Sequence, residues 1–289
     1  MSTSQIKTGH AVIGNAQIYY QLAGTGQPLI MIHAGVADSR QWGNEFAYFL
    51  KHFQVLNYDM RGYGKSEPVT GDFTHLQDLT ALINHLGIDL PAIIMGCSMG
   101  GGLALDFALM HPSKVKALIM VGSGPSDLAL DLPSPAKFEL VEAAYYEGDL
   151  DLAAELETQI WFDGIERTPT QVDPEMRQLA YKMNRLALSH ESKKLGERLP
   201  DSDVSAAGRL AELLVPVLII VGAYDIPYLH SAAQYMIEKI PSVRMEIIED
   251  AAHLPNMDQP DRFRRILRQF LAELSQKNVK ENQNESTHS

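Results

Sequence analysis

The segment from Ala92 to Met110 limits the possible folds more than any other part of the chain. An apolar run, Ala92 to Gly96, is followed at once by Cys97, by Ser98 and by a stretch typical of a helix. The order Gly96-x-Ser98-x-Gly100 is the Gly-x-Ser-x-Gly pattern in a strand–turn–helix context. Such a sharp turn predicts a strained backbone at Ser98 and small neighbours. The Ser98 hydroxyl is then expected above the sheet at a helix N-terminus, where free N–H groups stabilise negative charge.

The rest of the chain alternates short apolar runs with amphipathic stretches. After a hairpin at Ala11–Leu22, the expected strands are Pro28–His33, Gln54–Tyr58, Ala92–Gly96, Val115–Val121, Val217–Val221 and Met245–Ile248. Helical spacing of apolar residues is found in Leu76–Leu86, Met99–Met110 and Phe263–Leu274. This alternation predicts an α/β fold with a mostly parallel sheet and helices on both faces.

The strand pattern stops between residues 126 and 207, where apolar residues repeat at helical spacing. We therefore expect a core of residues 1–125 and 208–275, a helical insertion at 126–207 and a disordered polar tail at 276–289. The insertion holds 17 acidic and 8 basic residues, which accounts for most of the net charge of −12. This acidity is interpreted as a solvated helix surface or as a field that disfavours anionic substrates.

Composition excludes several classes of function. The net charge of −12 disfavours nucleic acid as a partner. A single cysteine, Cys97, allows neither an intrachain disulfide nor a cysteine zinc cluster and fits a reducing compartment. Gly64-Lys65-Ser66 ends like a phosphate-binding loop, but Asp59 stands where that loop needs glycine. Since Met1–His10 is polar and no spanning stretch is found, we expect a cytoplasmic protein that needs no membrane, metal or cofactor.

Four separated motifs occur in a fixed order. They are His33-Ala34-Gly35, Asp59-x-Arg61-Gly62-x-Gly64-x-Ser66, the turn at Ser98, and a late Asp225 and His253 that each follow a strand. In these motifs, from about Val12 to Leu274, the chain resembles the cap-bearing serine members of the α/β-hydrolase superfamily. These members include esterases, enol-lactonases and carbon–carbon bond hydrolases. The resemblance implies that the 126–207 insertion is a cap over the catalytic serine.

The family orders its catalytic triad as serine, acid and histidine. The resemblance therefore implies Ser98 as nucleophile, Asp225 as acid and His253 as general base. In such a triad the histidine takes the serine proton, and the acid orients the imidazole. Asp127 is the rival acid, because some members place the acid after that earlier strand. Cys97, next to the nucleophile, is expected to be a buried small residue.

The resemblance also implies an oxyanion hole made by the N–H groups of Met99 and Gly35. Family members have His-Gly where this chain has His33-Ala34-Gly35, so Ala34 is the alternative donor. In the insertion, Trp161, Phe162, Met183 and Tyr145 are candidates for binding the substrate. The alternative for each of them is packing of the cap on the core.

These features predict a serine hydrolase that cleaves small or medium carboxylic esters or lactones through an acyl-enzyme. An enol-lactonase-like enzyme is an alternative, since a dicarboxylate substrate would need basic residues and the cap offers Arg167, Arg177, Lys182 and Arg185. A carbon–carbon bond hydrolase with the same triad is another. An alternative of a different class is a receptor that keeps the triad, binds a small ligand and turns it over very slowly.

Overall fold

The structure, a computed structural model, describes the backbone of residues 5–201 and 205–286 and the side chains of the described residues up to 276. Its centre is an eight-stranded sheet with the strand order β1-β2-β4-β3-β6-β7-β9-β10. The strands are β1 (Lys7–Ile13), β2 (Ala16–Ala23), β3 (Pro28–Ile32), β4 (Gln54–Tyr58), β6 (Ala92–Cys97), β7 (Val115–Val121), β9 (Val217–Gly222) and β10 (Val243–Ile248). β1 and β2 form the predicted hairpin, and β2 pairs antiparallel with β4. The pairs from β4 onward are parallel, so the predicted α/β-hydrolase architecture is confirmed.

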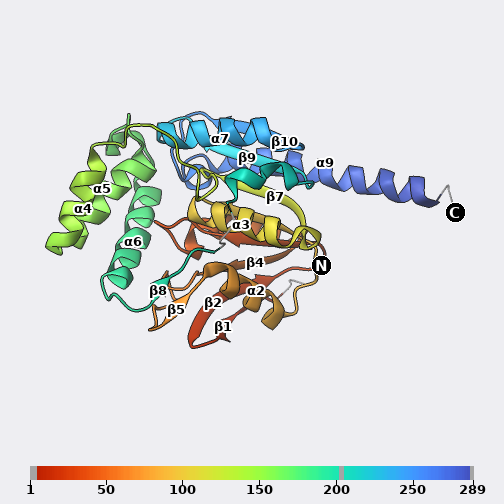
Figure 1. Ribbon diagram of the computed structural model, residues 1–289, viewed down its shortest axis with the longest axis horizontal. Helices are drawn as coiled ribbons and strands as arrows, with labels where there is room; N and C mark the ends of the chain where they lie inside the picture. Colours follow the sequence, from red (N-terminus) through yellow and green to blue (C-terminus); the bar gives the residue numbers. More distant parts are fainter. Residues whose placement is uncertain (1–4, 202–204, 287–289) are drawn as a thin grey trace.

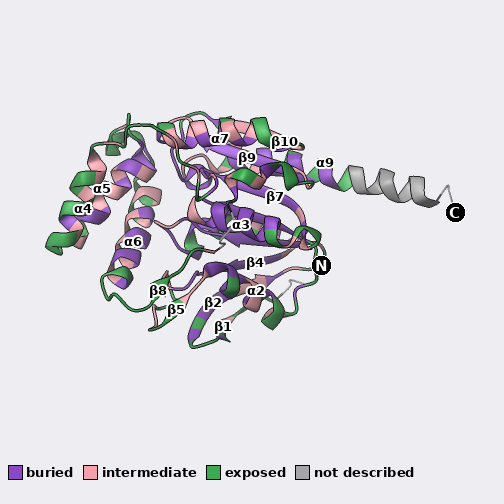
Figure 2. Ribbon diagram, viewed as in Figure 1, coloured by how far each residue is buried: buried purple, intermediate pink, exposed green. Residues whose placement is uncertain are grey.

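Both faces of the sheet are covered, and β3 shows how. Its Ile30 and Ile32 face one apolar core, whereas Leu29 and Met31 face the other. α2 (His75–Leu86), α3 (Met99–Met110) and α7 (Pro227–Lys239) contribute to the first core, and α1 (Gly43–Phe49) and α9 (Pro260–Ser286) to the second. The strands between them are buried along most of their length (Figure 2). The uninterrupted apolar runs in the sequence follow from this two-sided burial.

Three helices between β7 and β9 lie together to one side of the sheet (Figure 1). They are α4 (Lys137–Glu147), α5 (Leu150–Thr158) and α6 (Pro174–Glu191), and a π-helical turn, η3 (Gln159–Asp163), follows α5. Ala144, Ala153, Ala154 and Leu188 form a small apolar core of their own between these helices. We refer to residues 126–207 as the cap.

The chain returns from the cap through an element that the sequence analysis did not anticipate. β8 (Glu197–Arg198) pairs in parallel with β5 (Asp72–Phe73), which precedes α2. This two-stranded ribbon ties the end of the cap to a loop of the core. Short helical turns complete the chain: η1 (Ser39–Trp42), η2 (Pro112–Lys114), η4 (Pro169–Gln171), η5 (Ala207–Glu212) and α8 (Pro255–Asp258).

The C-terminal helix runs further than expected. α9 continues to Ser286 and projects from the body of the protein (Figure 1), whereas a disordered tail was predicted from residue 276. The polar residues there include Gln, Lys and Glu, which are good helix formers and need no apolar partner to extend an existing helix. Residues 287–289 of the predicted tail lie outside the described residues. Among the described helices, none is both long and apolar enough to cross a membrane.

Candidate active site

Ser98 occupies the sharp turn between β6 and α3. Its φ of 51° and ψ of −119° are the strained backbone conformation that the sequence predicted. The Ser98 N–H donates to the Val121 carbonyl at 2.8 Å, and the N–H groups of Gly101 and Gly102 donate to the Ser98 carbonyl. Neighbouring strand and helix thus hold the strained residue in place. The side chain of Ser98 is partly accessible, while Cys97 is fully buried.

The glycines beside Ser98 are required by close approach of the backbone. A Cβ at Gly96 would lie 2.0 Å from the Gly100 carbonyl oxygen, and one at Gly100 would lie 2.4 Å from the His33 carbonyl oxygen. Both distances are far below van der Waals contact. The Gly-x-Ser-x-Gly pattern is therefore explained by packing of α3 against β3 and β6.

His253 and Asp225 form a buried pair. His253 Nδ1 lies 2.9 Å from Asp225 Oδ2 and 3.2 Å from Oδ1, and the two residues are 1% and 4% exposed. Asp225 follows β9 and also accepts the Ile226 N–H, and His253 follows β10. The Trp161 ring lies 4.5 Å from the imidazole, and its carbonyl accepts the His253 N–H at 3.1 Å. The pair is thus fixed from the core and from the cap.

Gly122, which follows β7, lies next to the His253–Asp225 pair and lines the same hollow as Ser98. A Cβ at Gly122 would lie 2.9 Å from His253 Nδ1 and 3.1 Å from Asp225 Oδ2. Gly122 and Ser98 both line one hollow of 220 Å³. Since β6, β9 and β10 are parallel, the loops that carry the three residues leave the same edge of the sheet. The structure therefore places Ser98, Asp225 and His253 at the same edge of the sheet, with Gly122 next to the pair and in the same hollow as Ser98.

The alternative acid, Asp127, and the cysteine next to Ser98 each form a hydrogen bond with another part of the chain. Asp127 is exposed and accepts the Ala207 N–H at 3.0 Å. The Cys97 thiol is fully buried, donates to the His253 carbonyl at 3.6 Å, and has a pKa raised to about 12 by burial. A thiol with so high a pKa is a poor nucleophile at neutral pH.

The loop after β3 carries the two candidate N–H donors of the oxyanion hole, those of Ala34 and Gly35. The Ala34 N–H donates to Gln41 Oε1 at 2.9 Å, so it is already used. A Cβ at Gly35 would be in ordinary contact with the Met99 side chain, which places Gly35 beside the first residue of α3. His33 Nε2 accepts the Met60 N–H, and His33 Nδ1 contacts the Ala34 carbonyl. His33 is therefore a structural residue of this loop, and burial lowers its pKa.

A buried polar network links this loop to the one that carries His253. Gln41 Nε2 donates to Asn256 Oδ1 at 3.3 Å, and Asn256 Nδ2 donates to the Gln41 carbonyl at 2.7 Å and to Glu45 Oε2 at 3.2 Å. Burial raises the pKa of Glu45 to about 7. Asn256 follows His253 by three positions, so one side chain ties the histidine loop to the loop of Ala34 and Gly35.

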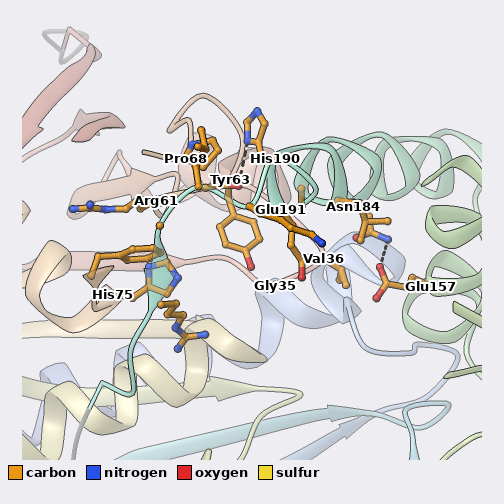
Figure 3. A pocket seen from close by; sticks show the side chains of 18 residues that line it. Gly35, Val36, Arg61, Tyr63, Pro68, His75, Glu157, Asn184, His190 and Glu191 are labelled. Carbon is orange, nitrogen blue, oxygen red and sulfur yellow. Dashed lines mark hydrogen bonds between the residues drawn. The ribbon is translucent and has the colours of Figure 1, made fainter. Parts of the chain in front are cut away.

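A cavity of 350 Å³ opens between Gly35 and the cap (Figure 3). Its wall on the core side includes Arg61, Tyr63, Phe73 and His75, and its wall on the cap side includes Glu157, Asn184, His190 and Glu191, with Lys194 and Arg198 on the return segment. The Tyr63 hydroxyl lies 3.8 Å from Met99 Sδ, and Met99 lines the hollow at Ser98, so this contact joins the two spaces. Arg198 lines both this cavity and the hollow at Ser98.

The four cap residues expected at the substrate do not line this cavity. Phe162 and Met183 are each 1% exposed and pack in the core cluster beneath the cap. Tyr145 packs within the helical cluster of the cap, and Trp161 contacts His253. Of the four residues, Trp161 is the one that contacts His253, whereas Phe162 and Met183 pack between the cap and the core.

The cap arginines are likewise engaged with acidic groups of the protein. Arg167 pairs with Asp258 at 2.6 Å, Arg177 pairs with Glu155 and Asp163, and Arg185 pairs with Asp151. None of these arginines lines the 350 Å³ cavity. The lysine and arginine residues that do line it are Arg61 of the core and, near the end of the cap, Lys194 and Arg198.

Sequence reasoning missed the polar residues of the cavity. Tyr63 lies inside the Asp59–Ser66 motif, but nothing in that motif marks it as a cavity residue. Glu157, Asn184 and Glu191 are polar residues in a stretch rich in charged residues, so their sequence looks like a solvated helix surface, and Arg198 lies on a ribbon without a sequence signal. A helical wheel could have set Glu157 and Asn184 apart from the acidic residues on the exposed surface of the cap. Both residues lie on the less exposed sides of their helices.

Comparison with known proteins agrees with this architecture. The sequence profile of the family described as "alpha/beta hydrolase fold" matches residues 27–260. A 2-hydroxy-6-oxononadienedioate/2-hydroxy-6-oxononatrienedioate hydrolase from Dechloromonas aromatica is 26% identical over 265 residues, covering 88% of this chain and 90% of that protein. A pimeloyl-[acyl-carrier protein] methyl ester esterase from Nitrosospira multiformis is 25% identical, covering 87% and 97%.

Solved structures show the same fold. The enol-lactonase from Burkholderia xenovorans LB400 superimposes with a TM-score of 0.74 at 20% identity, covering 91% of this chain and 99% of that one. An esterase from Exiguobacterium antarcticum gives a TM-score of 0.73 at 25% identity, covering 92% and 99%. With the family profile matched across most of its length, the chain belongs to the alpha/beta hydrolase fold family.

Proposed function

We propose that the protein is a serine hydrolase of carboxylic esters or lactones, with Ser98 as nucleophile, His253 as general base and Asp225 as the orienting acid. The observation that carries this proposal is the buried His253–Asp225 hydrogen bond of 2.9 Å, at the sheet edge where Ser98 occupies its strained turn. His253 Nδ1–H donates to Asp225, which leaves Nε2 as the base.

The reaction would proceed through an acyl-enzyme. Ser98 Oγ attacks the ester carbonyl as His253 takes its proton, and the imidazolium then protonates the leaving alcohol. A water activated by His253 releases the acid. The N–H groups of Met99 and Gly35 would stabilise the oxyanion, since the Ala34 N–H is held by Gln41.

Initial rates on p-nitrophenyl esters from acetate to laurate test this proposal. Ser98→Ala should lower kcat by at least about 10⁴-fold and leave Tm nearly unchanged. Cys97→Ser is the matched control at the neighbouring position and should keep most of the activity, because Cys97 is 0% exposed. Loss of hydrolysis in Cys97→Ser but not in Ser98→Ala would overturn the assignment.

Carbon–carbon bond cleavage is the second candidate, favoured by the identity of 26% to a hydrolase of dienedioates. The same triad would serve it. Turnover of aryl dienoates or dienedioates by the wild type, with no Ser98-dependent turnover of esters or lactones, would replace the ester proposal by this one. If none of these substrates is turned over but a small ligand raises Tm, a receptor would be the better description.

A further inference from the structure

The 350 Å³ cavity next to Gly35 is lined by several charged and polar side chains, although an esterase for simple aliphatic acids needs an apolar pocket. Glu157 and Glu191 line it from the cap, and neither has an ion-pair partner among the described residues. Glu157 keeps one hydrogen bond, from Asn184 Nδ2 to its Oε2 at 2.7 Å. The carboxylates therefore retain acceptor capacity that faces the cavity.

The opposite wall of the cavity contains a buried nitrogen atom that lacks a hydrogen-bond partner among the described residues. His75 is 2% exposed, and its Nδ1 has no hydrogen-bond partner within the described part of the chain. Burial lowers the pKa of His75 well below its usual value, so the ring is neutral at pH 7. A buried polar atom without a partner is costly unless a ligand or a water satisfies it. His75, Tyr63 and Glu157 thus offer polar groups on both sides of one space (Figure 3).

Of the lysine and arginine side chains that line the cavity, two already form ion pairs with aspartates. Arg61 binds Asp78 through two hydrogen bonds, of 2.6 and 2.8 Å, and Arg198 binds Asp201 at 2.8 Å. Within the described part of the chain, Lys194 is the lysine or arginine of the lining that forms no ion pair, and it stands against the two carboxyl groups of Glu157 and Glu191. A substrate carboxylate would face these two acids.

We infer that the cavity binds the far end of a substrate through a hydrogen-bond-donating group, a hydroxyl or an ammonium, and rejects a carboxylate there. This inference deepens the proposed function, because it concerns the substrate class of the same site. Glu157, positioned by Asn184, accepts the hydrogen bond. Burial raises the pKa of Glu157 and of Glu191, and the hydrogen bond from Asn184 opposes this rise at Glu157.

The test compares p-nitrophenyl esters of six- and eight-carbon acids that end in methyl, hydroxyl, ammonium or carboxylate. We expect kcat/KM for the hydroxyl- or ammonium-ended ester to exceed that for the carboxylate-ended ester at least tenfold. Which of the two donor-ended esters is faster identifies the end group. A carboxylate-ended ester that is hydrolysed as fast as the donor-ended ones would overturn the inference.

Two charge-matched variants locate the effect. Glu157→Gln keeps an acceptor for Asn184 but removes the charge, and it should reduce the discrimination against carboxylate at least fivefold. Glu142→Gln removes the same charge from an exposed position of α4 and should leave the discrimination unchanged. An equal change in both variants would mean that only the general acidity of the cap matters, which contradicts a local contact.

A binding measurement separates failure of this inference from failure of the proposed function. If no ester is hydrolysed in a Ser98-dependent way, the proposed function fails. Thermal shifts of Ser98→Ala with 1-hexanol, 1,6-hexanediol, 6-amino-1-hexanol and 6-hydroxyhexanoate then decide the substrate class. A larger rise in Tm with the diol or the amino alcohol than with the hydroxy acid supports the inference, and the reverse order overturns it.

Discussion

The two walls of the site are held in different ways. On the core side, Ser98, Asp225 and Gly35 sit in loops whose backbone groups are bonded to neighbouring strands or side chains. On the cap side, Glu157 and Glu191 project from helices whose outer faces are exposed (Figure 2). We therefore expect the core wall to carry the proposed chemistry. We expect the cap wall to select the end group of the substrate and to tolerate changes that leave the proposed triad undisturbed.

The largest expected effect is on the core side. Asp225→Asn should lower kcat by about 10⁴-fold, because the amide can favour the wrong imidazole tautomer and carries no charge to stabilise the imidazolium. Asparagine has nearly the same shape, so Tm should change little. Steady-state kinetics together with a thermal melt check both expectations. If the variant keeps its kcat, Asp225 is not a catalytic residue, and the core wall does not carry the chemistry that we propose for it.

A core glycine tests whether backbone packing is as strict as the distances imply. Gly96→Ala places a Cβ 2.0 Å from the Gly100 carbonyl oxygen, and we expect destabilisation of about 3 kcal/mol or more. Gly43→Ala is the matched control, since nothing lies within 4 Å of its Cβ. Urea unfolding of both variants gives the difference. Equal stabilities would mean that the turn at Ser98 adapts easily.

Met183 tests the division between packing and substrate contact in the cap. It is 1% exposed and packs with the core cluster, so Met183→Ala should cost about 2–5 kcal/mol of stability. The kcat/KM of the folded variant should stay within a few-fold of the wild type. Met183→Leu conserves volume and should cost less than about 1.5 kcal/mol. A large change in substrate preference without loss of stability would restore Met183 as a substrate-binding residue.

The same division explains what could be predicted from the sequence. Ser98, Asp225 and His253 could be proposed because each follows a recognisable strand, and strand order places strand ends together. For Phe162 and Met183 both substrate binding and packing stayed open, because apolar residues at helical spacing do not reveal whether a helix packs on the core or on a ligand. Arg198 and His75 line the same cavity, next to the β5–β8 ribbon, a two-residue pairing that has no periodic signal. The Gln41–Asn256 contact joins residues 215 positions apart and was equally invisible.

The smallest expected effect concerns a buried acid on the core side that the chemistry does not use. Glu45 is 0% exposed, its Oε1 has no hydrogen-bond partner in the described part of the chain, and its pKa is about 7 against an ordinary value of 4.5. Desolvation is the main cause of the raised pKa, while Asn256 and Arg264 oppose it. Between these two values the unfolded chain loses the Glu45 proton and the folded protein keeps it. This group therefore makes the protein less stable as the pH rises from 4.5 to 7.

Glu45→Gln removes this pH dependence and keeps an acceptor for Asn256. Since a tenfold change in proton affinity corresponds to about 1.4 kcal/mol, the variant should gain at most about 3 kcal/mol over the wild type at pH 8. At pH 4.5 the two should be nearly equal, and Glu142→Gln should show no such dependence. Urea midpoints at both pH values measure the difference. If Glu45→Gln is less stable than the wild type at pH 8, the ionised carboxylate is needed to hold Asn256, and the network between the two catalytic loops is electrostatic rather than a neutral hydrogen-bonded bridge.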